Sequence, residues 1–409
     1  MKKNMKRWLA LMLAMLMVLA ACSGSGEKSN DKTESGKMED VKIGFIFLGD
    51  ENSTYDKNFI NAAMAMKENL KLSDEQVIFK KNVPEGADAY EAAADLADRG
   101  CDIVFANSFG HEQYVIQAAQ EFPEVEFAHA TGTMAHTSGL DNFHNAFASI
   151  YEGRYLTGVA AGLKLNEMIE EGKIKENEAK LGYVGAYTYA EVISGYSAFY
   201  LGAKSICPSV TMDVQFTGTW YDETAEKEAA NMLINNGAVL ISQHADSMGA
   251  PTACEEAGVP NVSYNGSTIE AAPNTYLISS TIHWQPYFEY LVKQVSNGEK
   301  IASDWSFGIS EGSVGVNEMN PAIAPKGGQE KLNEIKEKLL NKEIFVFDTK
   351  NFTVDGKTLE SYMADVDTDP EYKPDTEVIK DGIFEESVFR AAPYFDLRID
   401  GIHMINEKF

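Results

Sequence analysis

The feature that most constrains this chain is a regular alternation of short apolar runs with segments of helical spacing. It begins at residue 41, where a continuous apolar run is typical of a buried parallel strand. The pattern predicts strands at 41–48, 76–81, 101–108 and 125–132, with helices at 58–70, 87–100 and 112–122 between them. Strands that alternate with helices form parallel sheets covered on both faces, so this part should form one α/β lobe.

The same alternation then occurs a second time. Strands are predicted at 179–186, 211–216, 238–244, 259–265 and 274–282, with helices around 191–203 and 223–236 and one more before 259. A long helix rich in small residues, 151–165, lies between the two sets, where the chain is expected to change lobe. An amphipathic helix, 327–344, precedes an irregular acidic tail, 345–409. The fold class is therefore α/β, with two doubly wound parallel-sheet lobes joined by a hinge.

The N-terminus has the pattern of an export signal. Lys2, Lys3, Lys6 and Arg7 precede an apolar run, 8–21, which is too short to span a bilayer of ~30 Å comfortably. The run ends in Leu-Ala-Ala-Cys, which resembles a bacterial lipobox with Cys22 as the lipidated residue. We therefore expect a lipoprotein signal peptide at 1–21 and a flexible linker at 22–39, whose composition cannot form a core. An ordinary signal peptide with a chance cysteine is the alternative.

Composition narrows the possible partners and compartments. The formal net charge is −27, which argues against nucleic acid or an anionic lipid surface as a partner. The expected attachment to the membrane is through lipid alone, on the extracytoplasmic face of the cell membrane. Cys101, Cys207 and Cys254 show no metal-binding or redox spacing, so they are expected to be buried core thiols.

The residues directly after the strands should carry the function, because open α/β sheets bind ligands beyond the carboxyl ends of their strands. These segments are 49–52, 107–110, 131–132, 218–222, 243–246 and 265–267. They combine small residues, aromatic rings, carboxylates and amides. That mixture suits a neutral ligand with a flat ring and hydrogen-bonding edges.

Several blocks of sequence carry a family likeness. They include "YDKNFINAAMAMK", "FAHATGT", "YEGRYLTGVAAG", "SAFYLGAKSICPSV", "TWYDETAEKEAANMLINNGAVLISQHAD" and "HWQPYF". These blocks occur in this order within residues 41–347. Through them the chain resembles the basic membrane protein family of lipoproteins, the purine nucleoside receptors of bacterial ABC importers. The resemblance implies a periplasmic-binding-protein type I clamp. Its first lobe would be 40–149 with 277–308, and its second lobe 150–276 with 309–409.

The resemblance also implies roles for particular residues. Asp50 matches the acidic residue that holds the ligand, and Phe59 and Trp220 match the aromatic residues that stack on a purine. Asn265 falls where many members use an aspartate to grip the ribose. Two departures, Ile60 and Tyr55, leave a free purine base as plausible as a nucleoside.

The full set of expected ligand-binding residues combines these with residues at the strand ends. It comprises Asp50, Tyr55, Phe59, Ser108, Phe109, Thr131, Trp220, His244, Asp246 and Asn265.

Structural explanations remain open for several of these residues and for two others near the strand ends, Asp222 and Glu191. Phe59, Trp220 and His244 could each be packing residues of a core. Asp222 suits the N-cap of the following helix better than a ligand contact. Glu191 could contact the ligand, or it could simply favour the positive end of a helix dipole.

The expected function is capture of a purine nucleoside or base by a monomer, for an ABC permease and its ATPase, without a cofactor or a metal. The alternatives are a ligand-sensing clamp of a membrane receptor and a secreted nucleosidase. The sequence contains no H-E-x-x-H or phosphate-loop motif, so an enzyme is not expected.

Overall fold

The computed structural model describes residues 38, 40–367 and 373–407. The expected signal peptide, 1–21, the lipidation site Cys22 and nearly all of the expected linker, 22–39, lie outside the described residues. Within the described part of the chain, no helix is both long enough and apolar enough to cross a membrane.

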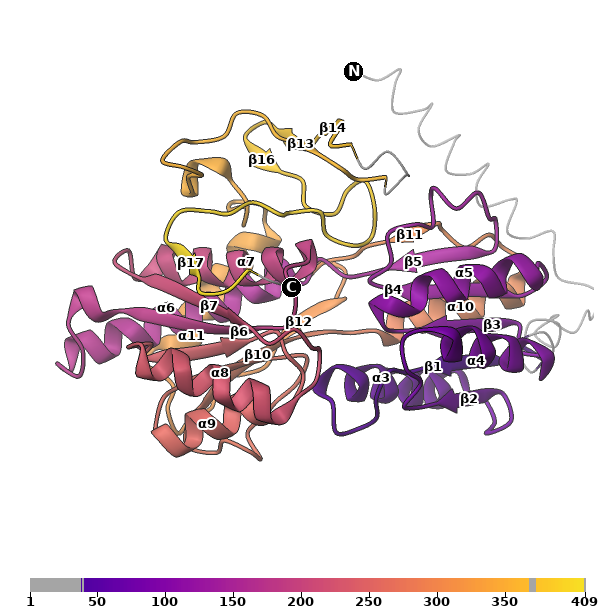
Figure 1. Ribbon diagram of the computed structural model, residues 1–409, viewed down its shortest axis with the longest axis horizontal. Coiled ribbons are helices and arrows are strands. Elements are labelled where there is room, and N and C mark those ends of the chain that lie inside the picture. Colours follow the sequence, from indigo (N-terminus) through magenta and orange to yellow (C-terminus); the bar gives the residue numbers. More distant parts are fainter. Residues whose placement is uncertain (1–37, 39, 368–372, 408–409) are drawn as a thin grey trace, which may run out of the picture. The chain divides into compact units, whose positions relative to one another are not determined.

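The first lobe is built on a six-stranded sheet in the order β11-β5-β4-β3-β1-β2, in which all neighbours are parallel (Figure 1). Its strands are β1 (Ile43–Ile46), β2 (Val77–Lys80), β3 (Ile103–Ala106), β4 (Glu126–Ala130), β5 (Phe143–Ala146) and β11 (Asp304–Trp305). The central strands β1 and β3 are fully buried, as their continuous apolar sequences predict.

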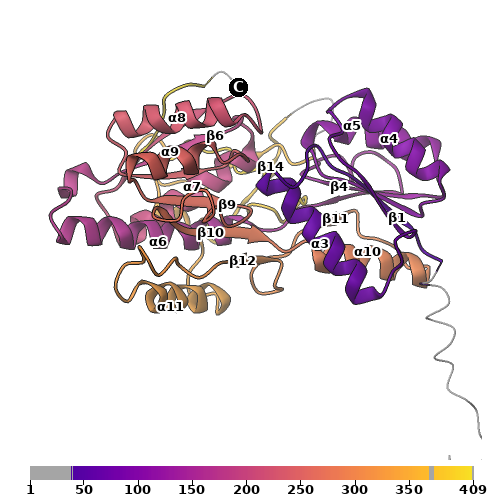
Figure 2. The same ribbon diagram turned by 90° about the horizontal axis from the view of Figure 1, so that it is seen from below.

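Four helices cover the two faces of this sheet. They are α3 (Thr54–Leu70), α4 (Ala87–Asp98), α5 (Glu112–Glu121) and α10 (Gln285–Asn297). Figure 2 shows α4 and α5 on one face and α3 and α10 on the other. Helix α3 begins four residues earlier than the sequence pattern predicts, because Ser53 caps it by accepting a hydrogen bond from the Asp56 backbone N–H at 3.1 Å.

The second lobe repeats the strand order of the first lobe. Its sheet runs β12-β10-β9-β8-β6-β7-β17, and only the pairing of β12 with β10 is antiparallel. The strands are β6 (Lys180–Gly185), β7 (Thr211–Phe216), β8 (Leu240–Gln243), β9 (Asn261–Tyr264), β10 (Tyr276–Ile282), β12 (Val314–Val316) and β17 (Ile402–Met404). Helices α6 (Tyr151–Glu170) and α7 (Ala190–Ile206) cover one face, and α8 (Glu223–Asn235) and α9 (Gly249–Ala257) cover the other. Helix α11 (Gly328–Leu340) packs on α6.

The two-lobed α/β fold is confirmed, but one expected boundary is wrong. The sequence-based division assigned residues from 277 onward to the first lobe, whereas β10 (Tyr276–Ile282) pairs with β9 in the second sheet. An apolar strand signal does not say which of two sheets receives the strand. The chain returns to the first lobe only after Ile282, at α10. Cys101, Cys207 and Cys254 are buried, as predicted.

The tail beyond residue 345 has a small aromatic core of its own. Phe395 stacks on Phe347, with ring centroids 4.1 Å apart, and contacts Phe384 edge-on at 4.7 Å. Farther along, β17 adds a parallel strand beside β7 of the second sheet. The backbone N–H of Ala391 donates to Asp304 Oδ1, on β11 of the first sheet, at 2.7 Å. The tail is therefore attached to both lobes.

Candidate functional site

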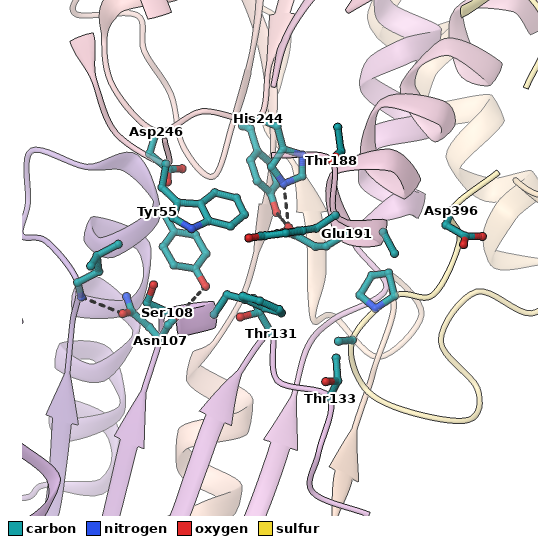
Figure 3. A pocket seen from close by; sticks show the side chains of 18 of the residues that line it. Tyr55, Asn107, Ser108, Thr131, Thr133, Thr188, Glu191, His244, Asp246 and Asp396 are labelled. Atoms are coloured by element: carbon teal, nitrogen blue, oxygen red, sulfur yellow. Dashed lines mark hydrogen bonds and ion pairs between the residues drawn. The ribbon is translucent and has the colours of Figure 1, made fainter. Parts of the chain in front are cut away.

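A cavity of about 410 Å³ lies where the carboxyl ends of strands from both sheets meet (Figure 3). Its lining residues come from both lobes and from the tail. They are Leu48, Tyr55, Asn107, Ser108, Phe109, Thr131, Thr133, Thr188, Tyr189, Ala190, Glu191, Trp220, His244, Asp246, Tyr264, Arg390, Ala392, Pro393 and Asp396. Its volume and its mixed aromatic and polar lining are those of a small-molecule binding site.

On the first-lobe side, Asn107 organises the wall after β3. Its Oδ1 accepts from the Leu48 backbone N–H at 3.0 Å, and its Nδ2 donates to Asp56 Oδ1 at 2.8 Å. Its backbone carbonyl accepts from the Tyr55 hydroxyl at 2.6 Å. These bonds hold the ends of β1 and β3 together and fix the Tyr55 ring against the cavity.

The loop after β4 is held by the buried carboxyl of Glu112. Glu112 Oε1 accepts from the backbone N–H groups of Thr133 and Met134 at 2.8 and 2.9 Å, and from Asn145 Nδ2 at 3.1 Å. Burial raises the pKa of Glu112, and these hydrogen bonds oppose the rise. Thr131, at the start of this loop, has φ of 67°, which a β-branched residue rarely adopts. Strained backbone of this kind gathers at functional sites.

On the second-lobe side, a chain of hydrogen bonds runs from the core to the cavity. The guanidinium of Arg154, which is fully buried, donates to the Tyr183 hydroxyl at 2.8 Å. That hydroxyl lies 3.2 Å from His244 Nδ1, and His244 Nε2 lies 2.8 Å from Glu191 Oε1. Arginine can only donate, so the Tyr183 hydrogen is available to Nδ1, and Nε2–H donates to Glu191.

Glu191 is consequently held with one oxygen bound and the other available. Its Oε1 accepts from His244 and, at 3.5 Å, from the Tyr264 hydroxyl. The residue lies in the first turn of α7, where the helix dipole favours a negative charge. Its Oε2 can accept an N–H or O–H group from a ligand in the cavity.

Asp246 supplies a second carboxyl, from the loop after β8. Burial raises the pKa of Asp246 well above its usual value, and the charges of Glu226, Asp56 and Glu191 add to the rise. The Asp246 backbone carbonyl accepts from the N–H and the hydroxyl of Thr54, both at 3.2 Å. Because Thr54 belongs to the first lobe, these two bonds join the lobes beside the cavity.

Aromatic rings from both lobes meet at the edge of the cavity. Phe109, of the first lobe, stacks on Tyr189, of the second, with ring centroids 4.9 Å apart and an interplanar angle of 29°. Tyr189 also stacks on Tyr187 at 5.1 Å, and Tyr187 meets Trp220 edge-on at 5.0 Å. Phe109 and Tyr189 remain more than one-third exposed, at 38% and 37%. Both rings line the cavity, so its edge carries an aromatic surface supplied by both lobes.

The structure brings most of the expected ligand-binding residues into this one cavity. The residues that line it are Tyr55, Ser108, Phe109, Thr131, Trp220, His244 and Asp246. His244 is buried and both of its ring nitrogens are hydrogen-bonded, as expected for a packing residue of the core. Its ring nevertheless lines the cavity. Asp222 is the N-cap of α8 and accepts from the Ala225 N–H at 2.9 Å, as its structural interpretation predicted.

Three expected residues lie elsewhere. Phe59 is fully buried and stacks on Trp284 at 4.5 Å, so the prediction of a sandwich formed by Phe59 and Trp220 is wrong. Asp50 lines a neighbouring hollow of about 310 Å³, and its pKa is lowered by hydrogen bonds from the Asn52 backbone and the Asn82 side chain. Asn265 is buried behind Asp246 and does not line the cavity.

Sequence reasoning missed parts of the site. Glu191 was a weak candidate, although its place in the first turn of a helix after a strand was a usable signal. Glu112 and Arg154 are buried behind residues that line the cavity, which they hold through hydrogen bonds, Arg154 by way of Tyr183. Burial of this kind is not visible in the sequence. The tail residues from Arg390 to Asp396 follow no regular strand and gave no signal at all.

Comparisons with known proteins identify the family of the chain. Residues 47–350 match the family model described as ABC transporter substrate-binding protein PnrA-like. The chain belongs to this family. Among its relatives, a purine-binding protein of Brucella abortus is 33% identical over 281 residues, which cover 68% of this chain and 75% of the relative.

Two further relatives differ in the ligand that their names state. A putative ABC transporter glucose-binding protein of Haloferax volcanii is 29% identical over 64% of this chain and 63% of its own length. An ABC transporter nucleoside-binding protein of Lactococcus lactis is 26% identical over 61% of this chain and 67% of its own length.

A solved structure agrees on the fold. An ABC transporter solute-binding protein from Aeropyrum pernix superposes with a TM-score of 0.62 at 17% identity, over 78% of this chain and 94% of that one. The role follows from the family match instead: the chain is an ABC transporter substrate-binding protein.

Proposed function

We propose that the protein captures a purine base or nucleoside between its two lobes and delivers it, chemically unchanged, to the permease and ATPase of an ABC importer. The observation that carries this proposal is the cavity itself. Trp220, Tyr189 and Phe109 offer flat surfaces, while Glu191 and Asp246 offer hydrogen-bonding groups in the same enclosed space. Stacking of a base on an aromatic side chain is worth about 1–3 kcal/mol.

The polar groups favour a ligand rich in N–H donors. Glu191 Oε2 is available as an acceptor, and hydrogen bonds to charged groups contribute about 1.5–3 kcal/mol. A purine ring presents N–H groups and acceptors in one plane, so it can stack on a ring and meet these side chains at its edges. The Brucella abortus relative, a purine-binding protein, and the Lactococcus lactis relative, a nucleoside-binding protein, support the same ligand class.

A thermal-shift screen with purines, nucleosides, pyrimidines, glucose and amino acids tests this proposal. A ligand that binds only the native state should raise the free energy of unfolding by ~2.7 kcal/mol at a hundredfold excess over its Kd. We expect purines or their nucleosides to raise the melting temperature and glucose to leave it unchanged. A shift with glucose alone would instead favour the ligand named for the Haloferax volcanii relative.

Two assays separate an importer's binding protein from the two alternatives, a nucleosidase and a sensing receptor. We expect incubated nucleosides to be recovered intact, whereas release of free base would indicate a nucleosidase. Uptake of labelled purine into cells that lack the protein should fall, which distinguishes an importer from a sensing receptor.

We further propose that Cys22 anchors the protein to the outer face of the cell membrane. The support is the Leu-Ala-Ala-Cys sequence ahead of a polar linker. One acyl chain gives only marginal membrane binding, so stable anchoring requires at least two. Cys22→Ala should release the protein from the membrane fraction or block signal cleavage, as judged by fractionation and mass spectrometry. Retention at the membrane with normal cleavage would contradict the proposal.

A further inference from the structure

One end of the cavity is formed by a part of the chain that lies beyond the family match. The match ends at residue 350, yet Arg390, Ala392, Pro393 and Asp396 all line the cavity. In Figure 3, Tyr55 and Asp246 lie at one end of the cavity, and Asp396 and Thr133 lie at the opposite end. The tail therefore extends the cavity beyond the end at which Tyr55 and Asp246 lie, which we call the ring end (Figure 3).

This tail wall, residues 390–396, is fixed in place from several sides. The Ala391 N–H donates to Asp304 of the first sheet at 2.7 Å, and the Ser194 hydroxyl of α7 donates to Glu386 just before the wall. The guanidinium of Arg390 braces the turn by donating to the backbone carbonyls of Ala392 and Pro393, at 3.1 and 3.0 Å. A wall held this way can present a side chain at a defined position.

Asp396 is the side chain that the tail wall presents. Its neighbour Phe395 is fully buried in the aromatic core of the tail, while Asp396 itself is exposed at the end of the cavity. The Tyr362 hydroxyl donates to Asp396 Oδ1 at 2.6 Å and orients the carboxylate. Burial and this hydrogen bond raise the pKa of Tyr362, so it remains a donor. A carboxylate has about four acceptor positions, which leaves Oδ2 for a ligand.

A threonine at this end also suits a polar group. Thr133 comes from the loop that Glu112 holds, and in Figure 3 it lies at the same end as Asp396. A threonine and a carboxylate offer acceptors and a donor to hydroxyl groups. By contrast, Tyr55 presents its ring at the opposite end (Figure 3).

We propose that the tail wall forms a second subsite, which binds a hydroxyl-bearing substituent on the ring ligand, and that Asp396 is its specificity-determining residue. The inference rests on the proposed function, because the ring end must hold a purine for the substituent to reach Asp396. Vicinal hydroxyl groups, as on a sugar, can donate to Asp396 Oδ2 and accept from a threonine hydroxyl.

Calorimetric titration of Asp396→Ala with matched pairs of probes tests the subsite. The pairs are adenine with adenosine, guanine with guanosine, and hypoxanthine with inosine. We expect the variant to bind the nucleoside of the pair about tenfold or more weakly than the parent, and to bind the free base within about twofold. Asp396→Asn keeps one acceptor oxygen and should lose less.

Asp375→Ala is the matched control, because it removes an exposed tail carboxylate that does not line the cavity. It should bind both members of each pair as the parent does, and the melting temperatures of both variants should equal that of the parent. Equal losses for base and nucleoside in Asp396→Ala, or no loss in either, would overturn the subsite while leaving purine binding intact. If the parent binds neither member of any pair, the proposed function fails and the subsite fails with it.

Discussion

Replacing Glu191 with alanine should weaken purine binding roughly ten- to hundredfold, which corresponds to the ~1.5–3 kcal/mol of a hydrogen bond to a charged group. Its carboxylate is already oriented by His244 and Tyr264 before a ligand arrives. The ligand therefore does not lose binding energy in ordering this side chain. Removal of the carboxylate also leaves the His244 Nε2–H without its acceptor in a buried site. Calorimetric titration with the purine identified by the thermal-shift screen measures the loss.

Two further variants make this test specific. Glu223→Ala removes a glutamate from the first turn of α8, where the residue is exposed and outside the cavity, and should bind as the parent does. Tyr183→Phe keeps Glu191 but breaks the chain of hydrogen bonds between Arg154 and His244, so it should give a smaller loss. If Glu191→Ala binds purines as tightly as Glu223→Ala, Glu191 is not a ligand contact.

The architecture was predictable because its signals are local. A strand such as β3 is buried on both faces, and its apolar run and the helical spacing of the segments on either side are visible within a few residues of sequence. The assignment of β10 was not predictable in this way. Its sequence marks it as a buried strand, but its partner β9 is determined by packing over the whole second sheet.

The candidate site was predictable only for residues that directly follow a strand and reach the cavity for that reason. His244 and Asp246 follow β8 and reach the cavity because parallel strands end at one edge. Phe59 was misassigned because Tyr55 and Phe59 share one face of α3, and only Tyr55, one turn closer to the end of β1, reaches the cavity. Asp396 depends on how a long irregular tail folds back, which no local pattern encodes.

The second lobe also depends on an unusually close contact between two helices. A Cβ atom added to Gly158 of α6 would lie 2.0 Å from the carbonyl oxygen of Phe199 in α7. A Cβ atom added to Gly202 of α7 would lie 2.0 Å from the carbonyl oxygen of Tyr155 in α6. Both obstructing atoms belong to backbone, which cannot rotate away as a side chain can. The small-residue character of α6 is thus explained by its packing on α7, the helix that carries Glu191 into the cavity.

Gly158→Ala should therefore lower the free energy of unfolding by about 1–3 kcal/mol, the usual cost of overpacking, even though alanine favours a helix by up to ~1 kcal/mol over glycine. Urea denaturation of the purified protein measures this. Gly266→Ala is the control, because a Cβ atom there meets nothing within 4 Å, and its effect should stay within about 0.5 kcal/mol. The double variant with Gly202→Ala should cost less than the sum of the two single changes, since the first already separates the helices. The displaced α7 should also weaken purine binding through Glu191. A Gly158→Ala protein as stable as Gly266→Ala would show that the helices do not approach this closely.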